Sequence, residues 1–238
     1  KFEYYEDFNL GFSTRTFYEK IDTDSTASSR QQSQEGNYFD TFFNSRFDYD
    51  KRNQRFRPDD GFRSTYTLDI PLVSETYTLT NRYNFQKYTS FYNNNVSSFG
   101  IYLEAANSIK GDDIKLTERL YIPTKKLRGF ERGKVGPKDG NDFIGGNYIA
   151  TINATTNIPI LFQNFQNLDA IFFLDVGNIW GVDYDSSIDD SDKIRSSVGI
   201  GIDWFSVVGP INFSLSEAIS QADTDITETF RFNIGTTF

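Results

Sequence analysis

The sequence predicts an all-β chain, a transmembrane antiparallel β-barrel, on three observations. Apolar and polar residues alternate with the two-residue period of strands through most of the 238 residues. Aromatic residues make up 17% of the chain, more than a soluble core requires. Short turns alternate with long polar loops, as in outer-membrane barrels. Mean hydropathy is low, at −0.52, but only alternate residues of a membrane strand face lipid.

About ten strands are expected from this alternation. They lie near residues 5–21, 37–51, 62–72, 75–92, 96–108, 145–161, 169–181, 194–206, 209–219 and 227–238. In FRSTYTLDI, for example, Phe62, Tyr66 and Ile70 share one face of the strand. Such segments are longer than the ~5–6 residues typical of globular strands, and they suit tilted strands that cross a membrane.

The connections fall into two classes. RPDDG, PLVSE and FSVVGP are tight turns, whereas residues 22–36, 109–144 and 182–193 are long and polar. Short turns at one end and long loops at the other favour a barrel in a membrane. A soluble β-sandwich would also show alternating strands. In this chain the polar faces of the strands carry small, hydrophilic side chains, which cannot form a core. A water-filled lumen and a lipid-facing exterior explain the pattern better.

Composition excludes several kinds of function. The chain has no Cys and no His, so thiolate or imidazole metal sites and catalysis by serine–histidine or cysteine–histidine pairs are ruled out. We therefore expect no enzyme activity and no cofactor. A net charge of −9 argues against nucleic acid as a partner.

Two loops carry concentrated charge. The segment from Lys125 to Asn147 is rich in glycine and in basic residues, and we expect it to complement an acidic lumen. The acidic stretch Asp183–Asp192 hints at calcium but lacks the glycine and terminal glutamate of an EF-hand, so a solvated loop is the preferred interpretation and no metal site is predicted.

Four segments resemble one family. LRGF at Leu127–Phe130, followed by Gly136–Pro137 and Gly145–Asn147, is similar to the lumen-loop motif of the BamA family, the barrel subunits that insert outer-membrane proteins. FFLDVGNIW resembles the strand that follows this loop, and YDKRNQRFRPDDGF resembles an earlier strand–turn–strand signature, with Asn53 and Asp60 departing from it. The terminal FRFNIGTTF resembles the signal by which outer-membrane barrels are recognised.

The resemblance implies a partial barrel. The family barrel has roughly sixteen strands, within the range of bacterial outer-membrane barrels, and about ten are found here. This sequence would then cover the C-terminal strands, residues 1–238, with the lumen loop at about 109–144 and without the earlier strands or the periplasmic POTRA domains.

The resemblance also implies how the loop is held. Its arginine, Arg128, pairs in the family with acids on the inner wall, and a guanidinium in a lumen needs a bidentate carboxylate. Asp175 matches the first acid, and alternation turns it inward. The second acid is replaced by Thr155, so a weaker pairing or another acid is expected. Glycines, Gly129 and Gly136 among them, allow the sharp turns of such a loop.

By the same resemblance, the chain would assemble and insert β-barrel proteins in the bacterial outer membrane. The last strand would part from the first as a lateral gate and template a client strand. The residues expected to matter in this strand are Phe230, Phe232, Ile234, Gly235 and Phe238. Expected partners are nascent barrel proteins, accessory lipoproteins, and outer-membrane lipid and lipopolysaccharide.

Other interpretations stay open at this point. A two-partner-secretion or TamA-type translocator shares the loop motif, and a passive porin would also be a barrel. Glu104 and Asp203 are expected to line the lumen. Trp180, Trp204 and Tyr148 lie near strand ends and are expected in the aromatic belts.

Overall fold

The computed structural model describes residues 6–91, 95–159, 161, 162, 165, 167–188, 192–206 and 209–234. These residues form one antiparallel sheet of ten strands, whose order in the sheet follows their order in the chain. The predicted all-β antiparallel fold is confirmed. Because each strand pairs with the next along the chain, every connection is a hairpin-type link, either short or long.

The strands fall close to their predicted positions. They are β1 (Phe8–Ile21), β2 (Gly36–Asp50), β3 (Gly61–Val73), β4 (Thr78–Ser90), β5 (Val96–Ser108), β8 (Tyr148–Asn157), β9 (Leu168–Trp180), β10 (Arg195–Ser206), β11 (Gly209–Ser220) and β12 (Phe230–Ile234). β8 begins later than predicted because Leu120 and Gly146 form a bridge within the loop. Two predicted residues of the last strand, Gly235 and Phe238, lie outside the described residues.

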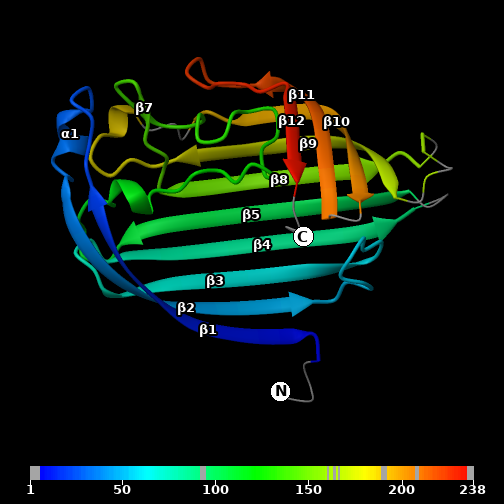
Figure 1. Ribbon diagram of the computed structural model, residues 1–238, viewed down its shortest axis with the longest axis horizontal. Helices are drawn as coiled ribbons and strands as arrows, with labels where there is room; N and C mark the ends of the chain where they lie inside the picture. The colour runs from blue at the N-terminus through cyan, green and yellow to red at the C-terminus, as the bar shows by residue number, and fades with distance from the viewer. Residues whose placement is uncertain are drawn as a thin grey trace.

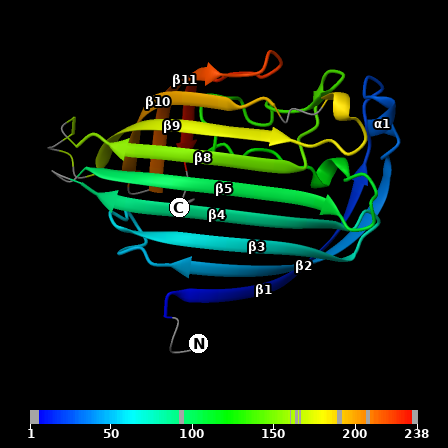
Figure 2. The ribbon, with the colours of Figure 1, turned by 180° about the vertical axis from the view of Figure 1, so that it is seen from behind.

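The sheet is strongly curved (Figures 1 and 2). In Figure 1, β10, β11 and β12, in orange and red, cross in front of β9 and β8 as far as β5, and the green loop that follows β5 lies on the same, concave side. β1 and β12 are the ends of the sheet, and they do not pair with each other in the described part of the chain. The sheet therefore encloses the loop on its concave side and leaves two free edges.

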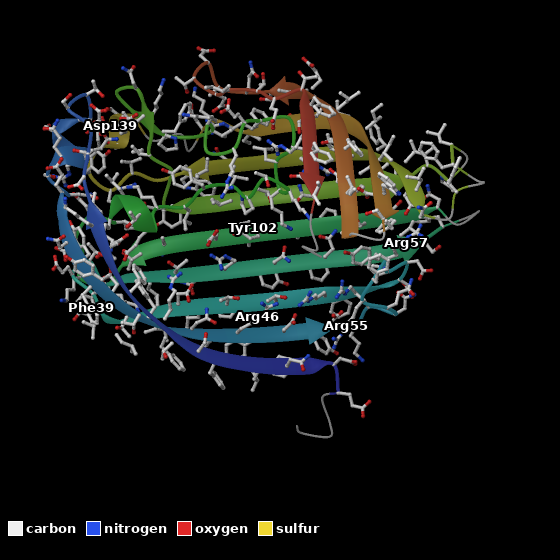
Figure 3. All side chains as sticks on the ribbon, viewed as in Figure 1. Phe39, Arg46, Arg55, Arg57, Tyr102 and Asp139 are labelled. Atoms are coloured by element: carbon white, nitrogen blue, oxygen red, sulfur yellow. The ribbon has the colours of Figure 1, made fainter. Side chains whose placement is uncertain are left out.

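The convex face is apolar and exposed. Large side chains on it keep much of their surface uncovered, for example Phe12 (62%), Phe39 (54%), Ile200 (54%) and Phe230 (55%). Aromatic rings run across neighbouring strands, with Tyr49 and Phe62 centred 5.6 Å apart. Figure 3 shows Phe39 at the outer edge of the sheet. A soluble monomer rarely exposes apolar surface on this scale, whereas lipid would cover it.

The concave face holds the apolar core. Its buried members come from the loop after β5 and from the inner faces of β5, β8 and β9: Tyr102, Ala106, Ile114, Leu120, Leu127, Phe130, Val135, Ile149 and Ile179. Tyr102 is labelled on this inner face in Figure 3. The core thus forms between a loop and a wall, rather than between two sheets.

The long loops contain short regular elements that period counting does not detect. The loop after β1 holds a one-turn helix, α1 (Ser29–Gln32), closed by a capping box at Ser28. The loop after β5 contains the 3₁₀ turn η2 (Leu116–Glu118) and a two-residue hairpin, β6 (Lys138–Asp139) and β7 (Asp142–Phe143). A further 3₁₀ turn, η3 (Ser186–Ile188), follows β9. Each of these elements is too short to show a recognisable periodicity of apolar residues in the sequence.

The turn between β2 and β3 does more than reverse the chain. Residues 51–60, which we call the turn strap, reach β9 and β10, which are distant in sheet order. Arg57, labelled in Figure 3, donates to Asp169 at 2.6 Å, and its guanidinium lies 4.6 Å from the Phe205 ring centre. The strap therefore joins two distant parts of the curved sheet at the short-turn end.

Candidate functional site: a basic loop held against the inner wall

Arg128 and Asp175 form the central contact of the site. The guanidinium Nε and Nη2 of Arg128 lie 2.7 Å from the two carboxylate oxygens of Asp175, and the Arg128 backbone N–H donates to the same carboxylate at 3.0 Å. Asp175 is fully buried. It points inward because β9 alternates, as the sequence predicts. Parallel charge-assisted hydrogen bonds of this kind fix orientation as well as position.

Neutral groups complete the surroundings of this pair. Thr155 accepts a hydrogen bond from Arg128 Nη2 at 3.2 Å, in the place where the resemblance implied a second acid. Asn153 donates to Asp175 at 2.8 Å and also to the backbone carbonyl of Lys126 at 2.8 Å. The guanidinium stacks 3.6 Å from the ring centre of Phe173. A hydroxyl, an amide and a ring thus surround a single ion pair.

Glycine is required at position 129 because the loop lies close against the inner face of the sheet there. Its φ is +87°, and a Cβ there would lie 3.0 Å from the Cβ of Ser197 on β10. The Ser197 hydroxyl also donates to the Arg128 carbonyl. A side chain at position 129 would be strained twice, by the left-handed backbone and by contact with the wall.

Phe130 connects the loop to the segment before β12. It is 2% exposed and forms an antiparallel bridge with Thr227. The Glu228 backbone N–H donates to the Gly129 carbonyl at 3.0 Å. Arg231 of β12 donates to the carbonyls of Phe130 and Thr124. The loop tip is therefore hydrogen-bonded to the last described strand as well as to β9.

The Gly136–Pro137 pair packs deeper in the lumen. Gly136 has φ +102°, and a Cβ there would meet Ile179 Cγ2 at 2.5 Å. Its N–H donates to Asp225 at 3.3 Å. Asp225 also accepts from Arg195 Nε at 2.8 Å, and both side chains are fully buried. This second ion pair holds the returning half of the loop.

The roots of the loop are held by other charges. Lys115 Nζ lies 2.6 Å from Asp40, and the carboxylates of Glu19 and Glu118 are also within ion-pair distance. Burial alone would lower the pKa of Lys115, but the hydrogen bonds to Asp40 and Glu19 raise it above its ordinary value. Lys115 thus stays a cation in a nearly closed site.

Asp183, which follows β9, holds the same root of the loop from another side. It accepts from the Ile114 N–H at 2.5 Å and from Arg119 at 2.6 Å. Burial alone would raise the pKa of Asp183, yet these two donors bring it below its ordinary value. Asp185 binds the backbone and hydroxyl of Ser187. Both carboxylates therefore already have partners within the protein, and no group of three possible metal ligands occurs among the described residues.

The described residues of β12 that the sequence analysis expects at a gate lie on the convex face. Phe230, Phe232 and Ile234 are 55%, 47% and 63% exposed, and the Phe232 ring centre lies 5.0 Å from that of Phe213 on β11. β12 pairs with β11 on one side only, within the described residues. The strand thus presents apolar side chains outward and a free backbone edge laterally.

A comparison with protein families matches residues 1–238 to the Omp85 superfamily domain. The chain belongs to the Omp85 superfamily. Its strands therefore lie in the outer membrane, in agreement with the exposed apolar face of the sheet. Among the described residues, no helix is long and apolar enough to cross a bilayer.

Relatives of this Omp85 chain carry the name outer membrane protein assembly factor BamA. The protein from Neorickettsia risticii is 30% identical over 131 residues, which is 54% of this chain and 18% of the relative. The protein from Neisseria meningitidis serogroup B is 26% identical over 139 residues, 47% of this chain and 17% of the relative. The chain thus spans less than a fifth of these relatives.

The fold has a close counterpart in a solved structure. The crystal structure of BamA from Haemophilus ducreyi lacking POTRA domains 1–3 superposes with a TM-score of 0.83 and 22% identity, over 95% of this chain and 51% of that one. The predicted barrel fold of this Omp85 chain is thereby confirmed.

Several residues of the site were not predicted. Arg195 and Arg231 carry a detectable signal, because alternation places a guanidinium on the inner face and such a group needs a partner. Asp225 lies in a loop and gives no such signal. Among the expected belt residues, Tyr148 and Trp180 pair at 5.8 Å at one end of the sheet, and Trp204, 40% exposed, lies toward the other. The expected lumen charges bind neighbours, Glu104 to Arg82 and Asp203 to Asn212.

Proposed function

We propose that this Omp85 chain supplies the C-terminal strands and lumen loop of a barrel that assembles and inserts β-barrel proteins in the outer membrane. The observation that carries the proposal is the double attachment of the loop tip, to Asp175 on β9 and to the segment around β12. Membership of the superfamily and the assembly function for which the relatives are named support it.

The attachment suggests what the loop does. Arg128 fixes the tip to a strand in the middle of the sheet, and Phe130 with Arg231 ties the same tip to the end strand. We propose that the loop sets the position of β12 and so controls when its edge is available. A free strand edge is a template for pairing with another chain, and a client strand would add there by β-augmentation.

The proposal includes no covalent chemistry and no cofactor. The partners would be unfolded barrel proteins, accessory lipoproteins, and outer-membrane lipid and lipopolysaccharide. A translocator that moves its client across the membrane, rather than into it, uses the same edge and stays an alternative. A passive porin fits less well, because the loop occupies the concave side and contributes most of the buried core.

The test uses Arg128 variants in the full-length protein, reconstituted in liposomes. Arg128→Ala should slow the folding of a client barrel by about tenfold, the equivalent of ~1.4 kcal/mol. Arg128→Lys should recover only part of the rate, because an ammonium cannot form the bidentate pair. Arg132→Ala, which changes an exposed arginine of the same loop, is the matched control and should keep the original rate.

The readout is the fraction of client that migrates as folded protein in unheated gels. An Arg128→Ala protein with an unchanged client rate would reject the role of the loop. If the original protein conducts ions but does not change the folding rate of any client, the porin interpretation would be favoured.

A further inference from the structure

The turn between β8 and β9 is unusually apolar for a connection. Residues 158–167, which we call the apolar turn, read IPILFQNFQN and include no charged side chain. Among its described residues, Leu161 is 60% exposed and Phe165 is 58% exposed. Turns that face water are ordinarily polar, and a cluster of exposed apolar side chains marks a surface that meets a membrane or another protein.

The exposed side chains of the apolar turn form one cluster. The rings of Phe162 and Phe165 meet edge to face, with their centres 6.4 Å apart. The Phe165 N–H donates to the Phe162 carbonyl at 2.9 Å, and the Leu161 N–H donates to the Ile158 carbonyl at 3.2 Å. These two backbone hydrogen bonds hold Leu161 and Phe165 in a short, folded segment.

Both ends of the apolar turn are fixed to the sheet. The Ile158 N–H donates to the carbonyl of Ala170 on β9 at 2.7 Å. The Asn167 carbonyl accepts from the N–H of Phe205 on β10 at 2.8 Å. The turn therefore keeps its place at the strand ends.

The turn strap, at the same end of the sheet, has a very different composition. Residues 51–60 read KRNQRFRPDD and are rich in charged side chains. Through Arg57 the strap binds Asp169 and lies against Phe205. Arg55 and Arg57 are labelled in Figure 3. An apolar sequence is thus not a general property of the turns at this end, and the apolar turn needs an explanation of its own.

The convex face of the sheet continues into the apolar turn. Leu168, the first residue of β9, stands opposite Trp204 in the strand register. Trp204 and Phe172 are 40% and 43% exposed. Alternation places Leu168 and Phe172 on the same face of β9, so a row of apolar side chains leads along the lipid-facing side of this strand to the turn.

We propose that the apolar turn inserts Leu161 and Phe165 into the periplasmic leaflet of the outer membrane, at the boundary between headgroups and acyl chains. Short turns of outer-membrane barrels lie on the periplasmic side, and aromatic side chains favour the membrane interface. The partner is the phospholipid surface itself, without preference for a headgroup, because the turn has no charge that would select one. Lipid contact then extends past the strands to a connection. The inference concerns this contact alone and is independent of the assembly function.

The test measures where side chains of the turn lie in lipid. Residues 1–238 contain no cysteine, so Leu161→Cys or Phe165→Cys gives a single site for a nitroxide label in this part of the full-length protein, once cysteines elsewhere are changed to serine. Arg55→Cys, at an exposed position of the turn strap, is the matched control. Each variant is placed in phosphatidylcholine nanodiscs, and its collision rates with oxygen and with a water-soluble nickel chelate are compared.

Oxygen concentrates among acyl chains and the chelate stays in water. At positions 161 and 165, collisions with oxygen should therefore exceed those with nickel, and the order should reverse at position 55. Labels at 161 and 165 that behave like the control would overturn the proposal in favour of a solvated turn. Labels shielded from both reagents would overturn it in favour of a covering protein domain. A preference for oxygen that appears only after phosphatidylglycerol is added would overturn the apolar mode of contact. Two label positions keep the test decisive if one substitution disturbs the turn.

Discussion

The tip and the root of the lumen loop are both held by buried ion pairs, but the two pairs are built differently. At the tip, one arginine meets one carboxylate in a bidentate contact, and the other described side chains hydrogen-bonded to this pair are neutral. At the root, one lysine is shared by three carboxylates from β1, β2 and the loop itself. The planar guanidinium fixes the direction of its carboxylate partner, whereas an ammonium group can donate to carboxylates on any side.

We interpret this difference as a division of roles, in which the tip positions the end strand and the root supports the loop. The tip is directional, and it is also bonded to the segment around β12. The root is adaptable, and its charged contacts among the described residues reach β1, β2 and the segment after β9 rather than the segment around β12. We therefore expect damage at the tip to alter the end strand, and damage at the root to loosen the loop without altering that strand. The following predictions test this contrast.

The largest effect is expected at Asp175. Asp175→Ala removes the one carboxylate bonded to Arg128 among the described residues and leaves a largely buried guanidinium without an ion pair, which costs about 3–5 kcal/mol of loop docking. Hydrogen exchange of the backbone amides from Lys126 to Glu131, and of Glu228, should accelerate together. Thr155→Ala, which removes a single 3.2 Å hydrogen bond, should cost only ~1 kcal/mol. Equal effects of the two variants would contradict the central role of the ion pair.

A smaller effect is expected at Lys115. Lys115→Met leaves Asp40 fully buried without its cation, at a cost of about 3 kcal/mol. Amide exchange should rise between Asp113 and Leu120 and stay slow at Gly129 and Glu228. Lys20→Met, which removes an exposed ion pair with Asp22, is the control and should change nothing. Exchange that spreads from the root to β12 would remove the distinction between root and tip.

The smallest effect is expected on lowering the pH, at the hydrogen bonds accepted by Asp183. Because the folded-state pKa of Asp183 lies below the ordinary value of 3.8, its stabilisation is complete above that value and is lost as the pH falls through the folded pKa. Protection of the Ile114 amide, which donates to Asp183, should therefore decrease as the pH falls below about 4. In Asp183→Asn this dependence should vanish. A pH-independent Ile114 amide in the original protein would refute it.

Much of the sheet could be predicted from the sequence, because alternation with period two is a direct consequence of strand geometry. The same alternation places Asp175 and Thr155 on the inner face, so their position on the inner wall follows from the pattern. The contact with Arg128 needed the family resemblance, since nothing local says where a long loop goes.

Other parts of the site depend on contacts between distant segments. The bridge from Phe130 to Thr227 and the pair of Arg195 with Asp225 join residues far apart in sequence. Asp225 lies in a connection with no period, so its partner cannot be read from spacing. The hairpin of β6 and β7 was missed because two-residue strands are too short to alternate.

The turn strap has a consequence for how the chain folds. Arg57 and Asp169 are 112 positions apart, so their bond can form only after the intervening strands have paired. Contacts of such high sequence separation are slow to form. A shift of β9 by one residue would also turn Asp169 to the outer face. The strap would then stay open, so its closure reports that the strands between β2 and β10 have reached their native register.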